Sequence, residues 1–170
     1  SFTRESLAVK GGFNVAAVLS PLRADPEACL SGESPLACEL RVHNPSVAII
    51  SMETWWSGQP DAYEKYMRQL LDYTISQGVV PILATKADNL EGENQINKAL
   101  ARLAWEYDIP LWNFWASVQG LPDKGLTSDG FHLTLGNYDY DDPVSTATGW
   151  SMRNLTALQA LDAVRLGVTP

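Results

Sequence analysis

The order of apolar and polar positions along the chain predicts strands that alternate with helices. The apolar runs 46–52 and 79–85 are short and rich in β-branched residues. Such runs are typical of strands that are buried on both faces of a sheet. We expect a further strand at 6–12, which ends in two glycines, and another at 109–115.

The stretches between these runs are longer and amphipathic, which predicts helices. A helix is expected to begin at Pro60, because proline suits the first helical turn, and to end before Gly78. Its apolar residues recur at helical spacing, and they are Tyr63, Tyr66, Met67, Leu70 and Leu71. We expect further helices over 13–22, 92–108 and 149–167, the one over 92–108 with Ile96, Leu100, Leu103 and Tyr107 on one face.

Alternating strands and helices with buried strands predict a parallel sheet that is covered by helices on both sides. The expected fold class is therefore α/β, a three-layer α/β/α sandwich with a mainly parallel sheet. Residues 1–170 are expected to form one domain. In such sheets the functional loops follow the carboxyl ends of the strands. The segment 126–134 follows the last predicted strand, so it can reach that edge.

Charge and hydropathy exclude several classes of partner. The formal net charge is −8 and the pI is near 4.6, whereas nucleic acids and anionic membranes bind basic surfaces. No apolar run reaches the ~18 residues that a membrane-spanning helix needs. The chain begins with Ser-Phe-Thr and has no initiator methionine or signal-like segment at its start, so we expect a processed or excised piece.

Two cysteines, Cys29 and Cys38, flank a short polar loop that contains Gly and Pro. We expect them to form a disulfide, which favours an extracytoplasmic or secreted protein; two free thiols in a cytosolic protein are the alternative. The two cysteines and the two histidines do not have the spacing of a zinc site, so no metal is expected.

The segment LTSDGFHLT (126–134) places an acid, Asp129, three residues before His132. A carboxylate at this spacing can orient an imidazole and stabilise its protonated form, as in a catalytic triad. A turn or a helix cap is the structural alternative for the same pair. We interpret Asp129 and His132 as the catalytic candidates because they follow the last predicted strand.

TSDGFHLT resembles the last sequence block of the SGNH hydrolases, the GDSL-type lipases and esterases, in which a D-x-x-H pair completes the triad. AVKGG resembles their second block, so the resemblance makes Gly12 an oxyanion-hole donor. NPSVAIISMETWW resembles their third block, and GVVPILATKADN and YDIPLWNFWASV resemble their next two strands. The resemblance covers about residues 6 to 165 and implies a flavodoxin-like α/β/α fold of the SGNH-hydrolase type.

The chain departs from the family pattern in two blocks. In the third block Glu53 takes the place of the glycine and Trp55 that of the oxyanion-hole asparagine; a shifted register puts Thr54 there. Gly-Asp-Ser, which carries the family's nucleophile, does not occur in these 170 residues. Ser1 is a poor substitute, since in the family a strand and a helix separate the serine from the second block. We therefore expect the serine and its strand to lie outside this stretch, in an upstream fragment or another chain.

Two functions are consistent with these residues. In the first, the protein hydrolyses small-molecule or carbohydrate esters, such as O-acetylated sugars, through a Ser-His-Asp triad whose serine lies elsewhere, and no cofactor is needed. In the second, the domain is catalytically inactive and serves in carbohydrate binding or structure. Lys86, Asp88 and Asn89 follow a predicted strand, and we expect them either to shape the loop or to contact substrate.

Overall fold

The structure is a computed structural model that describes residues 5–53 and 59–167 of the chain. It contains two compact units, Ser1–Pro81 and Ile82–Pro170. The division falls within strand β2 (Val80–Ala84), so this strand contributes residues to both units.

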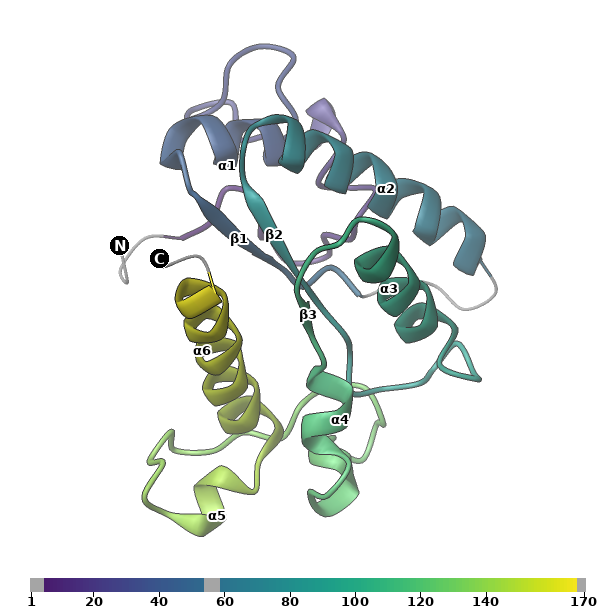
Figure 1. Ribbon diagram of the computed structural model, residues 1–170, viewed down its shortest axis with the longest axis vertical. Coiled ribbons are helices and arrows are strands. Elements are labelled where there is room, and N and C mark those ends of the chain that lie inside the picture. Colours follow the sequence, from purple (N-terminus) through teal and green to yellow (C-terminus); the bar gives the residue numbers. More distant parts are fainter. Residues whose placement is uncertain (1–4, 54–58, 168–170) are drawn as a thin grey trace. The chain divides into compact units, whose positions relative to one another are not determined.

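Three strands form a parallel sheet in the order β1-β2-β3, and helices flank it (Figure 1). The α/β class and the parallel sheet predicted from the sequence are therefore confirmed. Besides β2, the elements of the first unit are η1 (Pro21–Arg23), α1 (Pro35–His43), β1 (Val47–Ile50) and α2 (Pro60–Ser76). Those of the second unit are α3 (Gln95–Glu106), β3 (Leu111–Trp112), α4 (Phe114–Val118), η2 (Pro122–Gly125), α5 (Pro143–Thr146) and α6 (Gly149–Gly167).

Strand β2 lies between the other two strands, and its burial follows from that position. It pairs with β3 in parallel register, with Leu83 opposite Leu111 and Ala84 opposite Trp112. Ile82, Leu83 and Ala84 are almost completely buried, as predicted. The same prediction is wrong for β1, where Ile49 is 40% exposed. Among the described strands β1 is at the edge of the sheet, so part of its surface stays uncovered.

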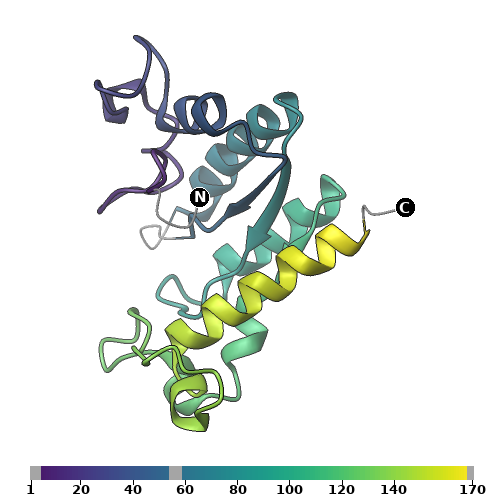
Figure 2. The same cartoon turned by 90° about the vertical axis from the view of Figure 1, so that its left-hand side faces the viewer.

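In the second unit, α3 and α6 lie on opposite sides of β3 (Figures 1 and 2). The indole Nε1 of Trp112 donates a hydrogen bond to Thr156 Oγ1 at 2.9 Å, which ties β3 to α6. The guanidinium of Arg153 lies over the rings of Trp112 and Trp150, at 5.7 and 5.2 Å from their centroids. Each such cation–π contact contributes about 0.5–1 kcal/mol or more where it is shielded from water.

The three long helices agree closely with the sequence pattern. Helix α2 begins at Pro60 and ends two residues before Gly78, whose φ of +74° suits glycine at a helix end. Helix α6 covers 149–167 as predicted, and α3 begins three residues later and ends two residues earlier than expected. The buried faces of α2 and α3 consist of Tyr63, Met67, Leu70, Leu71, Thr74, Ile96, Asn97, Ala99, Leu100, Leu103 and Ala104.

The predictions for the first 22 residues are wrong in secondary structure. Residues 6–12 form turns instead of a strand, and the backbone N–H of Leu7 donates to Glu39 Oε2 at 2.6 Å. Residues 13–22 form turns that lead into η1 instead of a helix. The side chain of Asn14 accepts hydrogen bonds from the backbone N–H groups of Ala16 and Ala17, which favours a local turn.

The third predicted strand, 109–115, is shorter than expected. Strand β3 ends at Trp112 because the next residue, Asn113, caps a helix: its Oδ1 accepts from the N–H of Ala116 at 3.2 Å. The apolar residues that follow therefore belong to α4 and not to the sheet.

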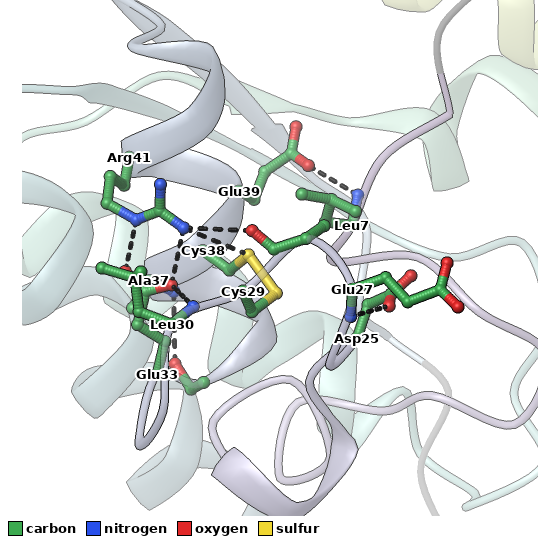
Figure 3. The surroundings of a disulfide bond; sticks show 12 residues. Leu7, Asp25, Glu27, Cys29, Leu30, Glu33, Ala37, Cys38, Glu39 and Arg41 are labelled. Atoms are coloured by element: carbon green, nitrogen blue, oxygen red, sulfur yellow. Dashed lines mark hydrogen bonds and ion pairs between the residues drawn. A yellow bond between two sulfur atoms is a disulfide. The ribbon is translucent and has the colours of Figure 1, made fainter.

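The predicted disulfide between Cys29 and Cys38 is present, and its Cα atoms are 5.3 Å apart (Figure 3). It joins an irregular loop to α1. Arg41 binds the same loop: its Nη2 donates to Glu33 Oε2 at 2.8 Å and to the carbonyl of Ala28 at 3.2 Å. The hydrogen bond from Arg41 lowers the pKa of the Glu33 carboxyl. The loop is thus fixed by one covalent bond and one ion pair.

Replacing both cysteines, Cys29→Ala with Cys38→Ala, is expected to lower the free energy of unfolding by ~2–3 kcal/mol, because the short loop gains conformational entropy in the unfolded state. Urea denaturation with and without dithiothreitol measures the effect. The reductant should destabilise the wild-type protein and leave the double variant unchanged; equal stability of the oxidised protein and the variant would contradict a stabilising disulfide.

Candidate active site

A short hairpin in the second unit carries the two catalytic candidates. Leu126 and Leu133 form an antiparallel bridge, and the N–H of Thr127 donates to the carbonyl of His132 at 2.8 Å. The hairpin turns where the N–H of Gly130 donates to the carbonyl of Thr127 at 2.9 Å. Gly130 has a φ of +70°, a conformation that glycine adopts without strain. The hairpin therefore brings the side chains of Asp129 and His132, three residues apart in the sequence, close together around one tight turn.

The carboxylate of Asp129 contacts the imidazole of His132 directly. Its Oδ2 lies 2.6 Å from His132 Nδ1. Its Oδ1 accepts three further hydrogen bonds, from Thr127 Oγ1 at 2.7 Å and from the backbone N–H groups of Phe131 and His132 at 2.8 and 2.9 Å. With four donors around it, the carboxylate is held in a fixed orientation, and it holds the imidazole in turn.

These hydrogen bonds also keep the carboxylate ionised. The hydrogen bond to the His132 side chain is the largest cause that lowers the pKa of Asp129 far below its ordinary value, and the backbone and Thr127 donors lower it further. An ionised carboxylate accepts hydrogen bonds only, so Nδ1 of a neutral His132 carries the proton. This leaves Nε2 as the basic nitrogen, which is the tautomer that a general base in a triad uses.

The His132 side chain is accessible. It is 71% exposed and the Asp129 side chain 49% exposed. The ring of Phe131 packs edge-on against the imidazole, with ring centroids 4.8 Å apart. The pair is therefore not enclosed by apolar side chains, and the imidazole can exchange protons with a bound molecule or with solvent.

Thr134 connects this hairpin to the start of α6. Its Oγ1 donates to the carbonyl of Gly125 at 3.1 Å and accepts from the N–H of Gly149 at 2.8 Å. Its carbonyl accepts from the N–H of Trp150 at 3.0 Å. Two of the helix's first N–H groups, which have no partner within the helix, are thus satisfied by one residue of the hairpin.

Gly125 and Gly149 pack together at this junction, which leaves no room for a side chain. A Cβ at Gly149 would overlap the carbonyl oxygen of Gly125 and lie 3.0 Å from Leu133 Cβ. Gly149→Ala is therefore expected to lower the free energy of unfolding by ~1–3 kcal/mol, the usual cost of overpacking. Urea denaturation measures this.

Gly167→Ala is the matched control, because it lies in the same helix and has no heavy atom within 4 Å of the added Cβ. It should leave stability unchanged or raise it slightly. Equal stability of the Gly149→Ala and Gly167→Ala variants would contradict the close packing at this junction.

A pocket of about 460 Å³ adjoins the hairpin in the second unit. Thr134, two residues after His132, lines it, and most of the other wall is apolar. The walls come from η2, α5 and the hairpin, with Pro122, Asp123, Pro143, Val144, Ala147 and Thr148 as the remaining lining residues. The volume suits a small organic group.

The other residues expected at the site lie in the first unit. Gly12 is exposed and has a φ of +81°, in a turn that the N–H of Phe13 closes by donating to Lys10 O at 2.9 Å. Thr54 and Trp55 lie outside the described residues. Glu53, which replaces the glycine of the family's third block, is buried, and its Oε2 accepts from Ser51 Oγ at 3.1 Å. The roles of Gly12, Thr54 and Trp55 remain predictions.

The loop after β2 contains a buried network of charges. Lys86 Nζ donates to Asp88 Oδ1 at 2.7 Å and to Glu91 Oε2 at 2.5 Å, and all three side chains are more than nine-tenths buried. Asn89 Oδ1 accepts from the N–H of Asn94 at 2.6 Å. Of the two roles expected for Lys86, Asp88 and Asn89, these contacts support the shaping of the loop.

Sequence reasoning missed the residues that hold the pair in place. The role of Thr127 could have been found from the sequence, because a threonine two residues before an aspartate often takes part in a turn. Thr134 has none, since its partners Gly125 and Gly149 are distant in the sequence.

The side chains that lie close enough to share a metal ion, within 5–53 and 59–167, are Cys29, Glu33 and Cys38, and the disulfide occupies both thiols. Over the same ranges, no helix has the length and hydropathy to span a bilayer. Comparison of the chain with protein-family models gives no match, and comparison with curated protein sequences gives none either.

Proposed function

We propose that this chain provides the histidine and the aspartate of the Ser-His-Asp triad of an SGNH-type esterase. The observation that carries the proposal is the contact between Asp129 Oδ2 and His132 Nδ1 at 2.6 Å in an accessible hairpin. His132 is the general base and acid, and Asp129 orients it. Gly12 is proposed as an oxyanion donor, with Thr54 or Trp55 as the second.

The reaction follows from the chemistry of a triad. Nε2 of His132 takes the proton of a serine hydroxyl as its oxygen attacks the ester carbonyl, and then returns it to the departing alcohol. In the second half of the reaction, Nε2 takes a proton from water as the water oxygen attacks the acyl-enzyme, and then returns it to the serine oxygen as the acid product departs. Asp129 stabilises the imidazolium that forms in each half. The substrate is a small-molecule or carbohydrate ester, and the disulfide favours an extracytoplasmic location.

The serine is proposed to lie outside these 170 residues, on a strand that joins the sheet. Two observations support this. Gly-Asp-Ser does not occur in the sequence. Strand β1 is at the edge of the described sheet, and its Ile49 is 40% exposed, so a further strand has both backbone groups to pair with and apolar surface to cover. The three-layer, SGNH-type arrangement of the whole sheet belongs to the same proposal.

Two measurements on the longest natural form of the polypeptide test the proposal. The first is hydrolysis of p-nitrophenyl acetate, and the second is treatment with phenylmethanesulfonyl fluoride, which sulfonylates activated serines. We expect turnover, its loss on treatment, and a sulfonylated peptide outside residues 1–170. Absence of turnover, or modification of a serine within these residues, would contradict the proposed division of the triad.

A second candidate function is carbohydrate binding or structural support by an inactive SGNH-like domain. The buried Glu53 favours it, because a carboxylate occupies the place of the glycine in the family's third block. A negative charge close to an oxyanion hole would oppose the charge that develops in the transition state. A protein that fails to turn over p-nitrophenyl acetate and binds a sugar would fit this function.

A further inference from the structure

The second unit contains another pocket, at the carboxyl ends of β2 and β3, that the proposed esterase chemistry does not use. Its volume is about 280 Å³. Thr85 follows β2, Asn113 and Trp115 follow β3, and α3 supplies the opposite wall. Loops and helices that follow the ends of parallel strands are the usual position for ligand sites in α/β proteins.

One face of the first turns of α3 forms this opposite wall of the pocket. Asn94, Asn97, Lys98 and Ala101 line the pocket, and their spacing of three or four residues puts them on the same side of the helix. Asn97 is fixed by two hydrogen bonds with the backbone of Lys86, at 2.9 and 3.0 Å. This wall is therefore rigid and carries amide groups.

Apart from Lys98, the polar side chains of the pocket are neutral, and one amide oxygen among them lacks a hydrogen-bond partner in the described part of the chain. Thr85 Oγ1 accepts from the N–H of Trp115 at 2.9 Å and donates to Asn113 Oδ1 at 3.3 Å, and this Oδ1 also accepts from the N–H of Ala116 at 3.2 Å. Among the described residues, the Asn94 Oδ1 is shielded from solvent and has no hydrogen-bond partner. Asn94 and its neighbour Glu93 both have a φ of +53°, which is unfavourable for a glutamate. The loop thus holds an unsatisfied amide beside the pocket.

We propose that this pocket binds a single neutral sugar ring. The amide oxygen of Asn94, which lacks a partner within 5–53 and 59–167, and the amide nitrogen of Asn113 suit the hydroxyls of a polyol, and the indole of Trp115 suits the apolar C–H face of a ring. No carboxylate lines the pocket, and its one cation, Lys98, is exposed. The buried network of one lysine and two carboxylates behind the loop has an excess of negative charge, which disfavours an anionic ligand. The inference is independent of ester hydrolysis.

NMR titrations of the full chain with D-glucose, D-galactose and N-acetyl-D-glucosamine test the proposal, with inorganic phosphate as the anionic probe. At least one sugar should shift the amide resonances of Thr85, Asn94 and Asn113 saturably, with a Kd in the range of about 1–10 mM, which is ordinary for one small ring. Ala101→Phe, which fills the pocket from an exposed helix position, should weaken this binding at least about tenfold.

Ala163→Phe is the matched control, because it adds the same ring to an exposed position of α6. It should bind the sugar as the wild type does. The thermal melting of both variants shows that they are folded. Lack of saturable shifts with all three sugars, a response to phosphate alone, or unchanged affinity in Ala101→Phe would overturn the proposal.

Discussion

Replacing His132 with alanine is expected to lower the kcat for p-nitrophenyl acetate hydrolysis by ~10⁴–10⁶-fold, the usual effect of removing a triad member. The physical reason is that Asp129 leaves Nε2 of His132 as the basic nitrogen. His132 is also the only histidine in the described part of the second unit, so no other imidazole there can replace it. The assay uses the longest natural form of the polypeptide and measures kcat and KM separately. The loss should fall on kcat.

His43→Ala is the matched control, because His43 is the chain's only other histidine. Its Nε2 lies 3.6 Å from Glu39 Oε2 at the end of α1, where it has a structural role. This variant should keep kcat within about twofold of the wild type. Turnover that survives His132→Ala, or an equal loss in both variants, would exclude His132 as the base.

Replacing Lys86 with methionine is expected to lower the free energy of unfolding by ~3–5 kcal/mol, the usual effect of breaking a buried ion pair. The carboxylates of Asp88 and Glu91 are more than nine-tenths buried, and both accept a hydrogen bond from Lys86 Nζ. Without the ammonium, two buried negative charges would lie close together without a cation. Urea denaturation of the wild type and the variant measures the difference.

Two further variants separate this effect from the loss of any lysine. Lys65→Met, at an exposed position of α2, should change stability by no more than ~0.5 kcal/mol. Combining Lys86→Met with Asp88→Asn and Glu91→Gln removes the uncompensated charge and should recover a large part of the loss. A Lys86→Met protein as stable as Lys65→Met would show that the network contributes nothing.

The fold is predictable where the sequence pattern is long and periodic. Helices α2 and α6 and strand β2 match their predicted ranges within one or two residues. For α2, the apolar spacing, Pro60 and Gly78 all indicate the same helix. Local capping overrides the pattern elsewhere. Asn14 directs the predicted first helix into turns, and Asn113 starts α4 where the apolar run indicated a strand. Both asparagines are capping signals that the hydrophobic pattern does not contain.

The candidate site is predictable only in part. Asp129 and His132 are three residues apart, so their contact follows from one turn of local structure. The support from Thr134 and the pocket beside Trp115 combine segments that are distant in the sequence, and their proximity depends on how β2, β3, α3 and α6 pack. Neither periodicity nor short-range spacing contains that information.

The protonation of the His132 ring tests the central claim most directly, because general-base action requires the basic nitrogen to be Nε2. Nitrogen-15 NMR of the imidazole side chains at pH about 8.5, where an ordinary histidine is neutral, reports which nitrogen carries the proton. His43→Ala assigns the two rings. We predict a protonated Nδ1 and an unprotonated Nε2 for His132, and a loss of this preference in Asp129→Leu. A His132 ring protonated at Nε2 in the wild type would contradict the account.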